Sequence, residues 1–251
     1  MNRLKDCRYG RMLFNIHDIY IGRSLDLYGE FSEGECDVFR QLILPGSTVL
    51  ELGANIGSHT VALAKFVGPN GRIIAFEPQR IVYQTLCANI ALNDLLNVDC
   101  KLQAVGELPS SIVVPNLDYT RDNNFGGLGL GAFTSGEQVP VVTVDSLNLN
   151  ACHFIKIDIE GMEREAILGG RKTIERFRPV LYVENDREDR SEGLTKTILE
   201  LGYVMYWHTP YMYNPNNFLG NPENVFPNII SKNMICVHES IQQNIDLPKV
   251  S

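Results

Sequence analysis

Acidic residues that follow apolar segments are the groups in this sequence best placed for proton-transfer or metal chemistry. Asp158 and Glu160 come after the apolar run 154–157, and Glu184 and Asn185 come after residues 180–183. Asp158 and Glu160 are two residues apart, so in a strand their side chains would face the same side. A hydroxyl is barely ionised at pH 7 and needs a base or a metal ion to become a nucleophile. We therefore expect Asp158 or Glu184 to act as a base, or Asp158, Glu184 and Asn185 to hold Mg²⁺ or another divalent cation through oxygen atoms.

Some of these residues, and the two further candidates His208 and Tyr28, could instead have structural roles. Glu160 could cap the following helix, because a carboxylate suits the positive end of a helix, and Lys156 could pair with a carboxylate. His208, after the sixth expected strand, is another candidate catalytic base because the ordinary pKa of histidine suits proton transfer. A structural role for His208 is the alternative. Tyr28, before Gly29, could close over a bound cofactor or simply pack in the core.

A glycine turn lies between the first expected strand of the main sheet and its helix. Gly53 and Gly57 allow the backbone to turn tightly and approach a ligand. The dinucleotide fingerprint G-x-G-x-x-G is not completed, because Asn55 and Ser58 stand at its later positions. This disfavours NAD. Glu51, which precedes the turn, could instead attract a cation such as an ammonium group.

A second acidic residue ends the next expected strand. Glu77 follows Gly57 by 20 positions, where a carboxylate can accept hydrogen bonds from two ribose hydroxyls. Pro78 disfavours helical backbone at Glu77 and keeps it at the strand tip. Turn, spacing and strand-end acid together predict a nucleoside-binding edge of the sheet.

The elements that position these residues alternate between strand and helix. Before residue 45 we expect a small cap, with a hairpin of residues 12–16 and 19–21 around His17 and Asp18, and a helix over 33–44. Residues 45–251 are expected to form one domain with a doubly wound, mostly parallel sheet. Its strands are expected at 48–52, 72–76, 99–105, 154–157, 180–183, 203–207 and 234–237, and its helices at 58–67, 79–92, 162–177 and 188–201. The glycine-rich segment 117–138 and the segment 209–231 are expected to be ordered loops over the binding site, and surface loops without a role in binding are the alternative.

Composition limits the classes of partner and compartment. The 251 residues carry a formal net charge of −8 and contain no run of Lys or Arg, so we expect a small molecule or neutral polymer rather than nucleic acid. No apolar stretch approaches the roughly 20 residues of a membrane span, and the N-terminus lacks the apolar core of a signal peptide. Six scattered cysteines without a C-x-x-C pair predict neither a zinc site nor disulfides. A soluble protein of the reducing cytoplasm is expected.

Several segments together resemble the FkbM-type methyltransferases, which use S-adenosylmethionine. The matching segments are 45–57, 74–78, 124–127, 144–147 and 155–163, of which the Lys-Ile-Asp-Ile-Glu-Gly sequence at 156–161 is the most specific. Order and spacing cover about residues 18–240. Two positions depart from the family pattern: Glu51 stands where relatives usually have aspartate, and the fifth strand ends on the more polar Glu184-Asn185-Asp186.

The resemblance implies an α/β fold with the Rossmann-like seven-stranded sheet of class I methyltransferases, its antiparallel seventh strand supplied by residues 234–237. It implies methyl transfer to hydroxyls of sugars, glycans or small natural products, and sometimes to amide nitrogen. The arrangement of Asp158, Glu184 and Asn185 also resembles the magnesium site of catechol O-methyltransferase-like enzymes. The cofactor-binding residues implied by turn, strand ends and family are Tyr28, Glu51, Gly53, Asn55, Gly57, Ser58, Glu77, Pro78, Gln103, Ala104 and Asp158.

Other functions stay open at this point. Within enzymes, the alternative is N-methylation of an amide, such as a peptide asparagine side chain. Outside enzymes, the chain could be a catalytically silent cofactor-binding module, although such a module has no need of Asp158 and Glu184. The Asp/Asn-Pro-Pro-aromatic tetrapeptide of enzymes that methylate exocyclic amines of DNA bases is replaced by Asp158-Ile159-Glu160-Gly161. Acceptor identity and oligomeric state do not follow from the sequence.

Overall fold

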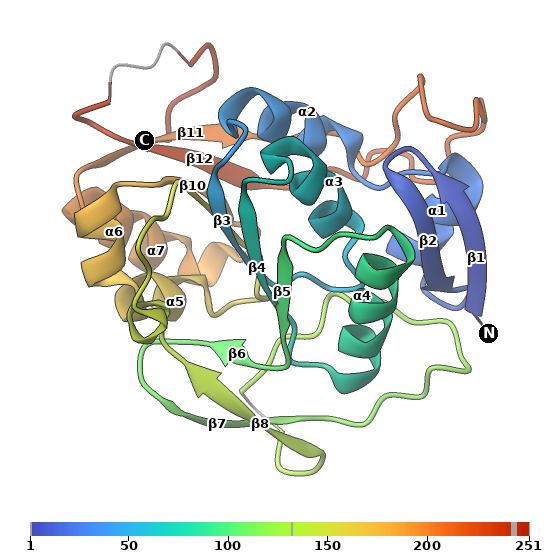
Figure 1. Cartoon of the computed structure of the whole chain (residues 1–251), viewed down its shortest axis with the longest axis horizontal. Coiled ribbons are helices and arrows are strands. Elements are labelled where there is room, and N and C mark those ends of the chain that lie inside the picture. Colours follow the sequence, from blue (N-terminus) through green and yellow to red (C-terminus); the bar gives the residue numbers. More distant parts are fainter. Residues whose placement is uncertain (1, 132, 242–244, 251) are drawn as a thin grey trace.

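The computed structural model describes residues 2–131, 133–241 and 245–250 and has a seven-stranded sheet at its centre (Figure 1). In spatial order the strands are β11 (Tyr203–His208), β12 (Asn233–His238), β10 (Val180–Glu184), β9 (Phe154–Ile157), β3 (Thr48–Leu52), β4 (Arg72–Phe76) and β5 (Val98–Lys101). β12 is antiparallel to β10 and β11, and the remaining neighbours are parallel. The expected fold class, including its antiparallel seventh strand, is confirmed.

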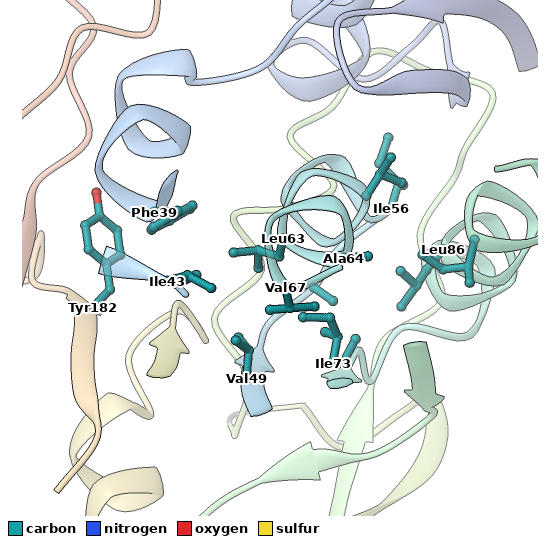
Figure 2. Packing of buried hydrophobic residues seen from close by; sticks show 14 of the residues in the cluster. Phe39, Ile43, Val49, Ile56, Leu63, Ala64, Val67, Ile73, Leu86 and Tyr182 are labelled. Atoms are coloured by element: carbon teal, nitrogen blue, oxygen red, sulfur yellow. The ribbon is translucent and has the colours of Figure 1, made fainter. Parts of the chain in front are cut away.

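Helices cover both faces of this sheet. On one face lie α2 (Glu33–Leu42), α3 (Ser58–Val67) and α4 (Arg80–Leu92), and on the other lie α5 (Glu163–Gly169), α6 (Arg171–Phe177) and α7 (Glu188–Glu200). Side chains along each strand alternate between the two cores: Val49 and Ile73 pack on the first face, and Leu50 and Ile74 on the second. Figure 2 shows Leu63 and Val67 of α3 beside Val49 and Ile73.

The N-terminal cap differs from the expectation. Its hairpin pairs β1 (Asn2–Cys7) with β2 (Gly10–Asn15), so the predicted hairpin around His17 and Asp18 is wrong. Residues 19–21 instead lead into α1 (Ile21–Tyr28), where the Asp18 carboxylate accepts the N–H of Tyr20 at 3.0 Å. The helical period prevailed because Ile21, Leu25 and Tyr28 share one buried face.

Part of the cap packs on the main core. Phe39 of α2 lies against Tyr182 of β10, with ring centroids 4.8 Å apart, and Ile43 joins the same cluster as Val49 (Figure 2). The helix expected over 33–44 is therefore present and seated on the sheet. A domain boundary at residue 44 stays a prediction.

Two expected elements are divided. The strand expected over 99–105 ends at Lys101, and β6 (Ala104–Val105) joins β8 (Glu137–Val142) and β7 (Ser110–Val114) in a separate sheet. The helix expected over 162–177 breaks at Gly170, where a Cβ would meet Val144 at 3.1 Å and the Ala166 carbonyl at 3.3 Å. β6 leaves the main sheet because it pairs with β8, a contact between distant segments that local periodicity does not encode.

The structure also bears on the expectations about membrane spans and disulfides. Across the described residues, no helix combines the length and apolarity needed to cross a membrane. All six cysteines are free thiols in the described structure.

Candidate active site

A cleft of about 460 Å³ opens at the carboxyl ends of the central strands. Its lining includes Glu51 of β3, Glu77 after β4, Asp158 after β9 and Glu184 of β10. The carboxyl ends of parallel strands meet at one edge of a sheet, which is where ligands bind in open α/β folds. The strand-end acids singled out in the sequence thus share one cavity.

The turn after β3 depends on glycine. Gly53 and Gly57 both have a φ of 85°. A Cβ on Gly53 would lie 1.7 Å from the backbone oxygen of Asp158, so only glycine lets the turn approach the end of β9. Gly53, Asn55 and Ser58 line the cleft, and Gly57 supports the turn as the N-cap of α3.

Glu77 is buried at the tip of β4 and holds this turn. Its Oε2 accepts the N–H of Asn55 at 3.0 Å, and its Oε1 accepts the N–H of Gln79 at 2.8 Å. Burial raises the pKa of Glu77 to about 7, although the two hydrogen bonds oppose the shift. Each carboxylate oxygen keeps a second lone pair, so Glu77 can still accept hydrogen bonds from a diol.

A narrower cavity adjoins the cleft beside Glu77. Pro78, Gln103 and Ala104 line it together, and it shares Glu77 and Asp158 with the cleft. Most of the other residues around it are apolar: Phe76, Val105, Leu128, Leu130, Ile159 and Met162. Such a lining suits a flat ring with few polar contacts.

Glu51 is a buried carboxylate that can accept a further hydrogen bond. It is 1% exposed, and its Oε2 accepts the Thr60 hydroxyl at 2.6 Å. Its Oε1 has no hydrogen-bond partner among the residues described. Burial raises the pKa of Glu51 to about 7. A buried oxygen left without a partner costs free energy, so Glu51 marks a position for a cation or a hydrogen-bond donor.

Lys156 of β9 is a cleft residue that the sequence argument considered only as an ion-pair partner. It is 2% exposed, and its Nζ donates to Asp158 at 2.8 Å. Burial alone would lower the pKa of Lys156, but the carboxylates of Asp158, Glu51 and Glu35 raise it above its ordinary value. The expected pairing with a carboxylate is confirmed, and a buried positive charge stands among the acids.

Asp158, Glu160 and Glu184 form a compact acidic cluster. One carboxylate oxygen of each lies within 4.8 Å of the others. Burial raises the pKa of Glu160 to about 7 and that of Glu184 well above its ordinary value, with the Asp158 carboxylate adding to both shifts. Glu160 accepts the Arg187 guanidinium at 2.7 Å. It does not cap α5, whose N-cap residue is Met162 and which has no side-chain cap hydrogen bond.

Asn185 stays a prediction as a metal ligand. β10 ends at Glu184, and Asn185, the next residue, is buried and is not among the described residues that line the cleft. Its amide donates to the sulfur of Met234 at 3.3 Å, inside the second core. Among the described His, Cys, Asp and Glu side chains, those of Asp158, Glu160 and Glu184 lie close enough together to converge on one ion.

His208 and Tyr28 are not among the described residues that line the cleft. The Nδ1 of His208 lies 2.8 Å from the Tyr182 hydroxyl, and burial lowers the pKa of this histidine. The hydroxyl of Tyr28 donates to the Glu223 carbonyl and accepts the N–H of Val225, both at 2.9 Å. The geometry favours the packing alternative for both residues over base or cofactor contact.

The two irregular segments reach the cleft in part. Asn124, Gly126 and Gly127 line it from the glycine-rich segment, and Met212 and residues 229–231 line it from the later one. The middle of the later segment docks on the cap instead. There, Glu30 accepts the Asn214 side chain and the Phe218 N–H, both at 2.8 Å.

Three further polar residues of the cleft were not identified from the sequence. Glu35 lies on α2, His59 in the first turn of α3, and Asn233 at the start of β12. All three are buried. Glu35 and Asn233 are distant in sequence from the glycine turn, and only the fold brings them to it. His59 follows the turn by two residues and could have been found as a polar residue in an otherwise apolar helix.

A family profile and two curated relatives match the chain. The profile of the methyltransferase FkbM domain matches residues 51–205. An arsenite methyltransferase from Halobacterium salinarum is 37% identical over 65 residues, which are 26% of this chain and 17% of that protein. Methyltransferase sdnD from Sordaria araneosa is 30% identical over 155 residues, covering 48% of this chain and 59% of that protein. The chain thus spans less than two thirds of either relative.

Solved structures share the fold. A methyltransferase FkbM from Methylobacillus flagellatus KT is 18% identical with a TM-score of 0.51, covering 80% of this chain and 50% of that one. TYW2 from M. jannaschii, solved in complex with AdoMet, is 16% identical with a TM-score of 0.50, covering 94% of this chain and 84% of that one. At these identities the likeness shows a common architecture.

Proposed function

Because this chain belongs to the methyltransferase FkbM family, we propose that it transfers a methyl group from S-adenosylmethionine to a hydroxyl of a sugar, glycan or small natural product. The observation that carries the proposal is the cleft itself. It combines the buried carboxylate Glu77, the carboxylate Glu51 with an oxygen that lacks a hydrogen-bond partner among the described residues, and the acidic cluster around Asp158 in one cavity.

The residues present fit S-adenosylmethionine. Among the described side chains, Glu51 keeps a buried oxygen without a partner, which suits the ammonium of the methionine moiety. Glu77 suits the ribose hydroxyls, and the apolar cavity beside Pro78 and Ala104 suits the adenine ring. When bound, the sulfonium group supplies an electrophilic methyl group.

The acidic cluster is proposed to accept the proton of the attacking hydroxyl. Glu184, whose pKa is raised by burial and by its neighbours, retains a proton more readily than an ordinary carboxylate. Lys156 holds the Asp158 carboxylate at 2.8 Å, so Asp158 is oriented for proton transfer. We assign Asp158 as the base that takes the proton from the hydroxyl. Glu184 is the neighbouring carboxylate that shares this proton with Asp158.

The acceptor is proposed to be a neutral small molecule or a glycan. Seven carboxylic residues line the cleft, against the three cationic residues Lys156, Arg187 and Lys232. An acidic cleft favours a cationic cofactor and disfavours a polyphosphate backbone. The carboxylic residues are Glu35, Glu51, Glu77, Asp158, Glu160, Glu184 and Asp186.

Labelled transfer tests this proposal. The protein is incubated with methyl-¹³C S-adenosylmethionine and separate small-molecule, glycan, peptide and RNA fractions of its source organism. The expected product is an O-methyl resonance in the small-molecule or glycan fraction. Label on an amide nitrogen or on RNA would contradict the proposed acceptor class, and binding without transfer to any fraction would favour the silent module.

A divalent cation is the second candidate role for the acidic cluster, because three converging carboxylates could supply oxygen ligands. A cation there would lower the pKa of a bound hydroxyl. Treatment with EDTA separates the two roles. Base catalysis predicts an unchanged rate after chelation, whereas a metal role predicts loss of rate and recovery on adding Mg²⁺ or Mn²⁺.

A further inference from the structure

The side of the cleft outside the matched family domain carries its own polar groups. Besides the apolar residues Tyr20, Phe31, Met212 and Ile229, it includes Glu35 of α2 and Ser231 of the last loop. His59 and Lys156 belong to the matched domain but face the same cavity. Of these polar residues, Glu35, His59 and Lys156 are buried, and Ser231 is partly buried.

Glu35 brings a carboxylate from the cap into the cleft. Its Oε1 accepts the Ser32 hydroxyl at 2.8 Å, and its carboxyl group also interacts with Ser231. Burial raises the pKa of Glu35, and the charge of Lys156 opposes this shift. A carboxylate carried this deep by an amphipathic helix is expensive to bury unless it has a polar partner.

His59 offers a lone pair. The ring packs between Phe31 and Phe39, each with its centroid 5.5 Å away, and hydrogen-bonds the backbone of Phe31. Its Nε2 has no hydrogen-bond partner within the described chain. Burial and the charge of Lys156 lower the pKa of His59 to about 3, so the ring is neutral. With Nδ1 engaged by Phe31, Nε2 is left as a hydrogen-bond acceptor.

We propose that Glu35, His59 and Lys156 form a subsite for a second hydroxyl of the acceptor, next to the one that is methylated. The inference rests on the proposed O-methyl transfer and assigns its acceptor to the polyhydroxylated compounds. Glu35 and His59 accept hydrogen bonds, while the ammonium of Lys156 has donors beyond the one given to Asp158.

The mixture of charges at the subsite selects for a hydroxyl. A carboxylate or phosphate would be repelled by Glu35 and Glu51. A hydroxyl is neutral and both donates and accepts, so it can satisfy groups of both kinds. The neighbouring Phe31 and Tyr20 offer aromatic faces for the apolar side of a ring.

The acceptor class is tested first. Products labelled from methyl-¹³C S-adenosylmethionine are purified from the source organism's extract and identified by mass spectrometry and NMR. The subsite predicts an O-methyl product with a free hydroxyl on the carbon adjacent to the methylated position. An O-methyl product without that hydroxyl would overturn the subsite and leave the proposed function intact. An N-methyl product or no transfer would instead overturn the proposed function.

Variants of the subsite then test its residues with the purified acceptor. Glu35→Gln turns an accepting oxygen into a donor, and His59→Phe removes the lone pair but keeps a packing ring. Both should raise the KM for the acceptor on the order of 10-fold to 100-fold. The Kd for S-adenosylhomocysteine, measured by calorimetry, should stay within about twofold, which also verifies folding.

Matched controls separate this effect from general damage. Asp37→Asn makes the same chemical change at an exposed position of α2, where the carboxylate pairs with Arg40. His238→Phe replaces a histidine packed on Tyr203, outside the cleft lining. Both controls should keep the wild-type KM. An unchanged KM in Glu35→Gln would overturn the subsite even if His59→Phe failed to fold.

Discussion

The proposed cofactor side and the proposed acceptor side of the cleft are built in different ways. The cofactor side is made largely from the backbone of one turn, which Gly53 and Glu77 hold against the end of β9. The acceptor side is made from side chains of the cap and of the loop before β12, such as Glu35 and Ser231. The matched family domain, residues 51–205, contains the first and omits these parts of the second.

Because of this difference, the two sides should differ in how well they tolerate substitution. A backbone turn tolerates few substitutions, because a Cβ at Gly53 would overlap the Asp158 carbonyl. A loop such as the one that carries Ser231 generally tolerates substitution better. The proposed cofactor side should therefore tolerate substitution less well than the loop of the proposed acceptor side.

Asp158, which lies where the two sides meet, should show the largest effect. Asp158→Asn keeps the shape of the side chain but removes the proposed base, so kcat should fall about 10²–10⁴-fold. The Kd for S-adenosylhomocysteine should change little. The measurement is single-turnover methyl transfer together with calorimetry of both proteins. A variant that keeps its full rate would show that Asp158 is not the base and would contradict its placement where the two sides meet.

Gly53→Ala should damage the cofactor side through the backbone alone. Gly46→Ala is a matched control, because Gly46 has a φ of 86° and an added Cβ would meet nothing within 4 Å. The control should lose about 1–2 kcal/mol of unfolding free energy from its left-handed backbone. Gly53→Ala should lose about 1–3 kcal/mol more from overlap. Urea unfolding measures both, and equal losses would show that close approach at Gly53 is unimportant.

Glu30→Gln should weaken the acceptor side while sparing the cofactor side. Glu30 accepts Arg8 at 2.7 Å as well as the Asn214 and Phe218 groups of the last loop. Loosening the loop should raise the acceptor KM by roughly threefold to tenfold, the loss of one or two ordinary hydrogen bonds. Asp26→Asn, which removes a cap carboxylate paired with Arg3, is the control. A matching rise in cofactor Kd would contradict the separation of the two sides.

The smallest expected effect is on the stability of the ligand-free protein, which should fall as the pH rises. Burial raises the pKa values of Glu51, Glu77 and Glu160 to about 7 from an ordinary 4.5. Between these values the folded chain binds more protons than the unfolded chain, so stability falls as pH rises from about 4.5 to 7. The melting temperature should drop by a few degrees between pH 5 and 8. Glu51→Gln should flatten that slope, and an equal slope in the variant would count against burial as its cause.

The sequence predicted the cofactor side better than the acceptor side for a physical reason. The turn, Glu77 and the strand-end acids are local patterns: a glycine pair, a proline and apolar runs of fixed length. Glu35, Asn233 and the docking of the last loop on Glu30 depend on contacts between segments far apart in the chain.

The wrong hairpin assignment has the same origin. The hairpin around Asp18 was predicted from alternating apolar residues, but Ile21, Leu25 and Tyr28 also fit a helical face, and burial in the cap decided between them.

The most direct test of the cofactor cleft is calorimetric titration of S-adenosylhomocysteine and of NAD into the wild type and Glu77→Ala. The wild type should bind S-adenosylhomocysteine and not NAD. Loss of the charged hydrogen bonds of Glu77 should weaken binding on the order of 10-fold to 100-fold. Unchanged affinity in Glu77→Ala, or tight binding of NAD by the wild type, would contradict the account.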